Sequence, residues 1–444
     1  MIKNSFDLQA EINAPEPYTA LCGEYVLALT EAKTYFTDGG FMHSFVQVSA
    51  GNKVIDGSAA HISVRLGEDP GGGLSVFSVT ESACGLTFYR MSMDITYGGK
   101  ASGSTVYGFN NHSCGLTVKD CKMDFSAKNQ ISYTAIHNDG KLDTNMETSA
   151  DRLMVSGNHI TANQNAADIT VESTLCGIDN TFANSASIFQ NNIFVKNVGK
   201  GAAQQAIGVR NSGWYMRLEN NNIKANGSHS NGDVLEQSHT YGVYNTGNYM
   251  LFTGNNCVGE WGGKCVGLYN SGRFSNITGN KILATHTIMG RSVVIATERN
   301  ILSGNIITNT SRNPHFIDVF NSKNVITNNC INGLMSMEEL RSGCGIFLMG
   351  EEDSKIEDCI ISNNIFDDIK DFGIVLINTH TNIIQGNHLG NVNKAERYTP
   401  IYAKNSDDKI YGNTYVPNRN ADTNDSELEK KLQRNYDRAV HSIV

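Results

Sequence analysis

Three carboxyl groups and one arginine in the middle of this 444-residue chain have types and spacing suited to acid–base chemistry. Asp179 and Arg210 occupy the same place in two copies of a short motif, and Asp233 and Glu236 lie in a polar segment after it. Two carboxyl groups, one acting as acid and one as base or nucleophile, are what cleavage or transfer of a glycosidic bond requires. We therefore predict Asp179, Asp233, Glu236 and Arg210 as catalytic residues.

A second reaction would use the same region differently. In β-elimination a base removes a proton next to the carboxylate of an acidic sugar, and a cation must neutralise that carboxylate. Arg210 beside Asp179 could provide the cation, and His137 or Tyr244 could provide the base. The non-functional alternative is an ordinary surface ion pair between Asp179 and Arg210, which would contribute little to stability.

The motif that carries these residues is typical of a β-strand. Because strand side chains alternate, an apolar residue that faces the core leaves its neighbour facing solvent. One outward column is then predicted to hold His137, Asp179, Arg210, Tyr244, Tyr269 and Phe320. A second solvent-facing column beside it is predicted to hold Gly177, Gly208, Gly242, Gly267 and Asp318. The copies of the motif are Gly177-Ile178-Asp179-Asn180, Gly208-Val209-Arg210-Asn211, Gly242-Val243-Tyr244-Asn245, Gly267-Leu268-Tyr269-Asn270, with Ile136-His137-Asn138 before them and Ile317-Asp318-Val319-Phe320-Asn321 after them.

These outward residues predict a sugar-binding track. Exposed aromatic rings offer apolar faces to sugars, and long turns before the motif would form walls beside the track. His239 and Trp261 lie in such turns, so we add them to His137, Tyr244, Tyr269 and Phe320 as candidate substrate-binding residues. The alternative interpretation is structural, because tyrosine favours strands and glycine favours turns.

A repeat centred on asparagine determines how the motif is positioned. Asn followed two residues later by an apolar side chain recurs ten times, at spacings of 23 to 35 residues, which fits a coil of three short strands with one variable turn. Asparagine tolerates the left-handed conformation of a sharp bend, and stacked asparagine amides can bond from coil to coil. We predict at least twelve coils, anchored at Asn158, Asn191, Asn221, Asn255, Asn280, Asn305, Asn328, Asn363, Asn387 and Asn413.

In this repeat the chain resembles the pectin-lyase-like superfamily of right-handed parallel β-helix proteins, which includes pectate lyases, phage tailspikes and inulin fructotransferase-type enzymes. A leucine-rich repeat is the rival, but its regular leucine frame is missing. The resemblance implies an all-β solenoid and, because such proteins are commonly trimers, a homotrimer. It implies no particular reaction, because the signature motifs of polygalacturonases, pectate lyases and alginate epimerases are absent.

Three regions follow from the repeat. Residues 1–44 are predicted to be an N-terminal cap and lead-in, 45–416 the β-helix, and 417–444 a tail with a short amphipathic capping helix. The helix is predicted from a capping box at Ser426 and Glu429, followed by apolar residues at helical spacing. Such caps protect the open ends of a β-helix, which are otherwise exposed sheet edges.

Composition restricts the partners and the location. A net charge of −9 argues against nucleic acid, and no apolar run is long enough to span a membrane. The first twenty residues lack a signal-peptide pattern, so an extracellular or virion-associated location is expected only from the resemblance. The ten cysteines have no metal-ligand spacing, and we interpret most of them as reduced and buried, with disulfides or metal binding as the alternatives.

The function expected from the sequence is therefore a carbohydrate-active enzyme acting on a polysaccharide or oligosaccharide. The first hypothesis is a glycoside hydrolase or transglycosylase with paired carboxylates, favoured slightly by the acidic charge. The alternatives are a polysaccharide lyase and a non-catalytic glycan-binding tailspike or adhesin. We expect no metal and no cofactor, with Ca²⁺ as the exception if the substrate is a uronate.

Overall fold

The structure, a computed structural model, describes residues 2–37, 40–140, 149–166, 171–199, 204–228, 238–287, 289–333, 343–392 and 399–415. The chain divides into two compact units, Met1–Gly263 and Lys264–Val444. We call them unit 1 and unit 2 and describe each by itself.

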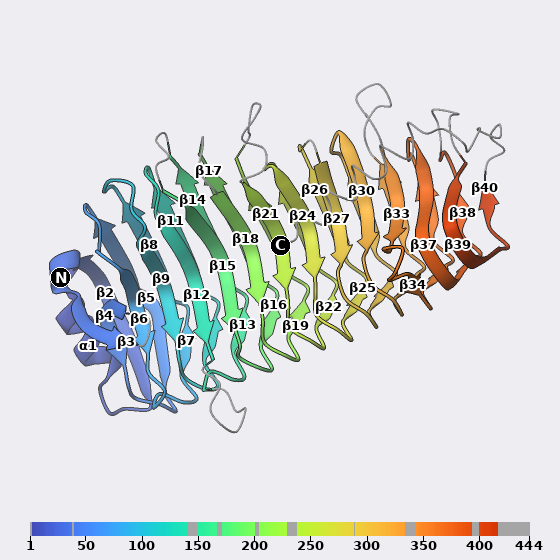
Figure 1. Cartoon of the computed structure of the whole chain (residues 1–444). Coiled ribbons are helices and arrows are strands. Elements are labelled where there is room, and N and C mark those ends of the chain that lie inside the picture. The colour runs from blue at the N-terminus through green and yellow to red at the C-terminus, as the bar shows by residue number, and fades with distance from the viewer. Residues whose placement is uncertain are drawn as a thin grey trace. The chain divides into compact units, whose positions relative to one another are not determined.

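Unit 1 is a parallel β-helix whose strands pair coil to coil in three ladders (Figure 1). The first ladder carries the predicted motif and consists of β4 (Gly40–Val48), β6 (Gly73–Val79), β9 (Thr105–Asn111), β12 (Ser132–Asp139), β15 (Ser173–Thr181), β18 (Gln204–Asn211) and β21 (His239–Asn245). The second consists of the start of β5 (Val54–Leu66), β7 (Thr87–Tyr89), β10 (Thr117–Lys119), β13 (Met154–Ser156), β16 (Ser187–Phe189), β19 (Arg217–Glu219) and β22 (Leu251–Thr253). The third consists of the end of β5, β8 (Ser92–Tyr97), β11 (Lys122–Ala127), β14 (His159–Asn165), β17 (Asn192–Val198), β20 (Asn222–Asn226) and β23 (Asn256–Glu260).

The N-terminal end of unit 1 is covered by a short helix, α1 (Ser5–Ile12), which packs against β2 (Tyr18–Ala28) and β4. Asn4 caps the helix by accepting hydrogen bonds from the backbone N–H groups of Phe6 and Asp7 at 3.0 and 3.1 Å. Strand β1 (Ile2–Lys3) pairs with β2, and β2 pairs in parallel with β5. After a 3-10 turn (Leu29–Glu31), β3 (Lys33–Thr37) runs antiparallel to β4. Parallel pairing thus reaches back to β1, and the boundary predicted at residue 45 stays a prediction.

Unit 2 repeats the same three-ladder arrangement. Its first ladder is β24 (Lys264–Asn270), β27 (Met289–Ile295), β30 (Asn313–Val319), β33 (Cys344–Met349), β37 (Phe372–Gln385) and β39 (Ile401–Tyr411). The second is β25 (Asn276–Thr278), β28 (Ile301–Ser303), β31 (Val325–Thr327) and β35 (Ile360–Ser362), and the later part of β37 pairs with β35 and with β34 (Ile356–Glu357). The third is β26 (Lys281–Thr285), β29 (Ile306–Asn309), β32 (Cys330–Gly333), β36 (Ile365–Asp367), β38 (His388–Leu389) and β40 (Thr414–Tyr415).

The predicted fold class is confirmed. The first ladder has seven strands in unit 1 and six in unit 2 among the described residues, which agrees with the expectation of twelve coils or more. Alternation fills the core: in β17, Ile193 and Val195 are fully buried, whereas Phe194 and Lys196 are only partly covered. The predicted tail and capping helix at 417–444 lie outside the described residues.

The asparagine repeat forms hydrogen-bonded ladders inside each unit. The side-chain Nδ2 of Asn191 donates to Oδ1 of Asn221 at 2.9 Å, and Asn221 donates to Asn255 at 3.0 Å. Two predicted anchors are wrong by one residue, because Asn329 and Asn364 occupy the ladder of unit 2. The assigned role of the anchor is also corrected. The left-handed residue at the bend is the one before the ladder asparagine, for example Gly157, Gln190, Asn220, Asn328 and Asn363.

A second asparagine ladder, not assigned from the sequence, closes the end of the first-ladder strands. In unit 1 the side chain of Asn138 donates to Asn180 at 2.7 Å, and Asn180 donates to Asn211 at 2.7 Å. Asn211 continues to Asn245 at 2.6 Å. These amides are buried, so the ladder satisfies groups that would otherwise be costly to bury. Two asparagine ladders therefore fix the register of the coils at the candidate site.

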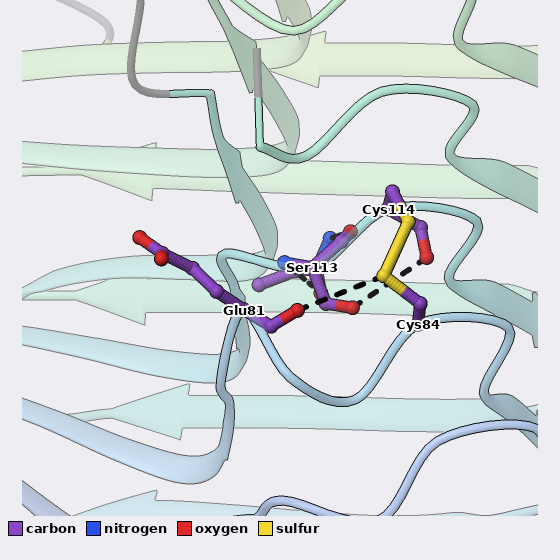
Figure 2. The surroundings of a disulfide bond; sticks show 5 residues. Glu81, Cys84, Ser113 and Cys114 are labelled. Atoms are coloured by element: carbon purple, nitrogen blue, oxygen red, sulfur yellow. Dashed lines mark hydrogen bonds between the residues drawn. A yellow bond between two sulfur atoms is a disulfide. The ribbon is translucent and has the colours of Figure 1, made fainter. Parts of the chain in front are cut away.

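Most of the cysteines are small buried side chains, as expected, although Cys22 is exposed and Cys330 is half-buried. Cys121, Cys176 and Cys257 are buried and reduced, as are three others: Cys265, Cys344 and Cys359. Cys84 and Cys114 instead form a disulfide between two turns of unit 1, shown in Figure 2. This pair therefore follows the alternative, a disulfide, and not the reduced state expected of most of the cysteines.

Candidate active site

Two columns of side chains share the outer face of the first ladder in unit 1. The strand register aligns Asn110, His137, Asp179, Arg210 and Tyr244 in one column. The other column, three residues earlier in each strand, is Tyr107, Thr134, Cys176, Ile207 and Tyr241. Ring contacts join the columns, with centroids 5.1 Å apart for Tyr107 and His137 and 5.0 Å apart for Tyr241 and Tyr244.

The glycines between these columns face the core and not the solvent, which corrects the predicted glycine floor. A Cβ on Gly177 would lie 2.5 Å from the side chain of Ile193, and one on Gly208 would lie 2.2 Å from that of Ile223. Both isoleucines belong to the third ladder and are fully buried. Each glycine therefore lets the strand bend over the core, and the bend brings residues three apart onto one outer face.

Asp179 holds the centre of this face. Its carboxylate accepts two hydrogen bonds from Arg210, Nε to Oδ1 at 2.9 Å and Nη2 to Oδ2 at 2.5 Å. Nδ1 of His137 lies 3.2 Å from Oδ2 on the opposite side. The Asp179 side chain is only 3% exposed, compared with 17% for His137 and 38% for Arg210. The buried carboxylate thus positions a histidine and an arginine that both reach solvent.

The protonation states of the cluster follow from these contacts. Burial alone would raise the pKa of Asp179, but the contacts with His137 and Arg210 outweigh burial and hold that pKa well below its usual range. The hydrogen bond to Asp179 in turn raises the pKa of Arg210. Asp179 is therefore a carboxylate and Arg210 a cation at any ordinary pH, so Asp179 cannot act as a proton donor.

Tyr107 and Cys176 complete the cluster, and the sequence analysis named neither. Burial raises the pKa of Tyr107, the charge of Asp179 raises it further, and Arg210 offsets part of the increase. The phenol therefore keeps its proton at neutral pH and could donate it. Burial also raises the pKa of the Cys176 thiol, so it is not a nucleophile.

A groove of about 1160 Å³ leads away from the cluster along the first ladder of unit 1. His137 and Tyr107 line one part of it, and Asp139 and His112, 3.6 Å apart, line another. The remaining lining comes from earlier coils and turns: Tyr35, Met42, Gln47, Asp69, Gly71, Gly72, Gly73, Ser78, Thr80, Glu81, Ser82, Gly103, Ser104, Thr105 and Asn110. The lining is acidic, because these residues include three carboxylates and no lysine or arginine.

The disulfide lies beside this groove. Cys84 follows the lining residues Glu81 and Ser82 in one turn, and Cys114 follows His112 in the turn of the next coil. Figure 2 shows Glu81 and Ser113 next to the sulfur bridge. The bond therefore ties together two turns that both contribute to the groove.

The predicted site residues of unit 1 are only partly brought together. His137, Asp179, Arg210 and Tyr244 are consecutive in one column, as predicted. His239 begins β21, and its ring lies 6.1 Å from that of Tyr241. Trp261 lies in a left-handed turn directly after β23. Asp233 and Glu236 lie outside the described residues.

Unit 2 holds the remaining predicted residues, with one shift of register. Tyr269 pairs with Val294, and Val294 pairs with Asp318. The alignment of Phe320 with Tyr269 is therefore wrong, and Phe320 lies just after β30. Strand β27 lies between β24 and β30 and lacks the motif, so the repeat did not predict it.

Among the described residues, no group of three or more His, Cys, Asp or Glu side chains is placed to hold a metal ion. No helix in the same residues has the length and apolarity to cross a bilayer.

Comparisons with known proteins show that this chain resembles several solved structures in fold. No family model matches the chain, and no curated protein matches it. Among solved structures, an alginate lyase is 14% identical with a TM-score of 0.43, covering 96% of this chain and 86% of its own. A periplasmic alginate epimerase mutant is 9% identical with a TM-score of 0.43, covering 94% and 84%. A DFA-IIIase from Arthrobacter chlorophenolicus A6 is 12% identical with a TM-score of 0.40, covering 92% of both chains. Likeness at this level concerns the fold alone, so the functional argument rests on this chain's own residues.

Proposed function

We propose that this chain is a carbohydrate-active enzyme that cleaves a glycan by β-elimination at the cluster of Tyr107, His137, Asp179 and Arg210. The observation that carries the proposal is the buried Asp179 carboxylate held between His137 and Arg210 beside the groove. An ionised, doubly paired carboxylate is unsuited to the paired-carboxylate mechanism, which needs a proton donor or a free nucleophile.

Each side chain then has a role that its surroundings support. Asp179 faces Nδ1 of His137, which favours the tautomer with its proton on Nδ1 and leaves Nε2 as a base. Arg210, still partly exposed, can bind the carboxylate of a uronate and stabilise negative charge beside it. Tyr107 keeps its proton and lies next to His137, so it can act as the acid. Asp179 is a positioning residue.

The reaction balances with these groups alone. Nε2 of His137 removes the proton from the carbon next to the uronate carboxylate. A carbon–carbon double bond forms as the bond from the neighbouring carbon to the glycosidic oxygen breaks. Tyr107 donates its proton to that oxygen, and one chain end becomes unsaturated. A Ca²⁺ requirement stays a prediction tied to a uronate substrate.

The acidic groove favours a second candidate, hydrolysis or transglycosylation of a neutral glycan. Asp69, Glu81 and Asp139 line the groove and would repel a polyanion. This reaction would need carboxyl groups other than Asp179, with Asp233 and Glu236 as the predicted pair. The disulfide suits an oxidising compartment, consistent with the predicted extracellular or virion-associated location. The homotrimer stays a prediction.

One experiment separates these possibilities. The protein is incubated with uronate polymers and with neutral glucans and fructans, and both ultraviolet absorbance and reducing ends are measured. Rising absorbance that is lost in His137→Ala and Arg210→Ala supports β-elimination. New reducing ends without a rise in absorbance overturn elimination in favour of hydrolysis. Difructose anhydride or larger fructose products indicate transglycosylation. Binding without any product overturns every enzymatic proposal. Asp94→Asn is the matched control, because Asp94 forms an exposed pair with His61 elsewhere in unit 1.

A further inference from the structure

The turns that follow the first-ladder strands of unit 1 form a stacked column of their own. In the turns from Asn52 to Tyr215 a left-handed residue donates its backbone N–H to a carbonyl of the next turn, as Ser185 does to Trp214 and Tyr215 does to Asn248. From coil to coil, the left-handed position is occupied by Asn52, Gly85, Gly115, Arg152, Ser185, Tyr215 and Tyr249.

Three aromatic residues gather at one end of this column, and we call Trp214, Tyr215 and Tyr249 the aromatic patch. The rings of Tyr215 and Tyr249 stack with centroids 4.9 Å apart and planes 12° apart. The Trp214 ring lies edge-on to both, at 6.5 and 6.4 Å. The three residues are 49%, 52% and 40% exposed. The rings therefore form a continuous apolar surface open to solvent.

Neither the geometry of the coil nor packing in the core requires aromatic side chains at these positions. Bulky residues disfavour the left-handed conformation, and most earlier turns of the column place Asn, Gly or Ser there. Tyr215 and Tyr249 adopt φ of 60° and 59° and still leave their rings substantially exposed. A backbone conformation that disfavours the residue, combined with exposed apolar area, is typical of a position retained for binding.

The size and surroundings of the patch indicate a sugar rather than a protein. Its exposed area is on the order of 300 Å², from typical areas of aromatic side chains. A stable protein interface needs about 800 Å² on each partner. No side chain in the turns 212–215 and 246–249 is charged, and Ser212, Thr246 and Asn248 are neutral polar residues. Aromatic rings edged by neutral polar groups match the apolar faces and hydroxyl rims of sugar rings.

We propose that the aromatic patch is a second glycan-binding site, which holds a polysaccharide chain outside the groove. The choice of a glycan as ligand rests on the proposed function. The patch follows directly from the strands of the reaction cluster, because β18 carries Arg210 and leads to Trp214, and β21 carries Tyr244 and leads to Tyr249. A long polymer bound there stays close to the reacting residues, whereas a short oligosaccharide gains nothing from it.

Electrophoresis in gels that contain one polymer each tests the proposal, with polygalacturonate, alginate, inulin and a neutral glucan as probes. The test variants are Tyr215→Gly and Tyr249→Gly, because glycine accepts the left-handed conformation and removes the ring without backbone strain. Ser185→Gly, one coil earlier in the same column, is the matched control. We expect one polymer to retard both tyrosine variants at least tenfold more weakly than the wild type. The control should be retarded as strongly as the wild type, and the turnover of short oligosaccharides should be unchanged in all variants.

The outcomes separate this inference from the proposed function. Retardation that depends on the tyrosines, in a protein that processes no glycan, supports the patch and overturns the enzymatic proposal. Turnover with retardation unchanged in both variants overturns the patch, as does a lack of retardation by every polymer. A change of oligomeric state in Tyr215→Gly, measured by sedimentation, overturns the glycan as ligand in favour of a protein contact.

Discussion

Replacing Asp179 with asparagine tests whether the buried carboxylate holds the reaction cluster together. The substitution keeps the shape but removes the charge, and it turns one acceptor into a donor that faces the donors of Arg210 and His137. Breaking one partner of a buried ion pair costs about 3–5 kcal/mol. Because the Arg210 side chain is 38% exposed, solvent screens part of this loss, and we expect unit 1 to lose about 2–4 kcal/mol at neutral pH.

The pH dependence gives the sharper test. The pKa of Asp179 is lowered in the folded state, so its stabilising effect is complete above the unfolded pKa and is lost as pH falls toward the folded pKa. With an unfolded pKa of about 3.9, the stability difference between wild type and Asp179→Asn should shrink by about 1.3 kcal/mol between pH 6 and pH 3.

Denaturant unfolding of both proteins at the two pH values measures this difference. Asp94→Asn serves as the control, because both members of the His61–Asp94 pair are largely exposed and the expected effect is below about 0.5 kcal/mol. If Asp179→Asn is no less stable than the control at neutral pH, the buried carboxylate does not hold the cluster together. The same follows if the stability difference stays constant or grows as pH falls.

Three further predictions concern the ladder, the disulfide and the proposed acid. Asn221→Ala leaves several buried backbone and amide groups without partners and should destabilise unit 1 by about 2–4 kcal/mol in denaturant unfolding, whereas the exposed neighbour Asn222→Ala should change little. Replacing Cys84 and Cys114 with serine opens a 30-residue loop and should cost about 3–4 kcal/mol, and a reducing agent should have the same effect on the wild type but none on the variant. Tyr107→Phe keeps the ring against His137 but removes the proton, so turnover in the absorbance assay should fall about 10²–10⁴-fold with an unchanged unfolding midpoint; full activity would exclude Tyr107 as the acid.

The fold could be predicted from the sequence because its signal is local and repeated. Each coil needs a left-handed residue followed by a buried amide at the same bend, and glycine–asparagine pairs recur for that reason. The same period aligned His137, Asp179 and Arg210, since residues at equivalent places in adjacent coils are neighbours in a parallel ladder. The coil of β27 lacks the motif, so the repeat did not predict this strand. As a result, Phe320 was aligned at the place that Asp318 occupies in the structure.

The composition of the site depended on contacts that no spacing rule contains. Strict alternation places Tyr107 and Asn110 on opposite faces, but the glycine bend puts their two columns on one face, and only there does Tyr107 meet His137. The sequence holds near-copies in Cys84-Gly85-Leu86-Thr87 and Cys114-Gly115-Leu116-Thr117, which indicates equal positions in two coils but does not show that the two sulfurs face each other. The repeat in the sequence is therefore enough to predict the coil and the order of residues along it. Which side chains share a face depends on tertiary contacts, because each strand bends according to the core beneath it.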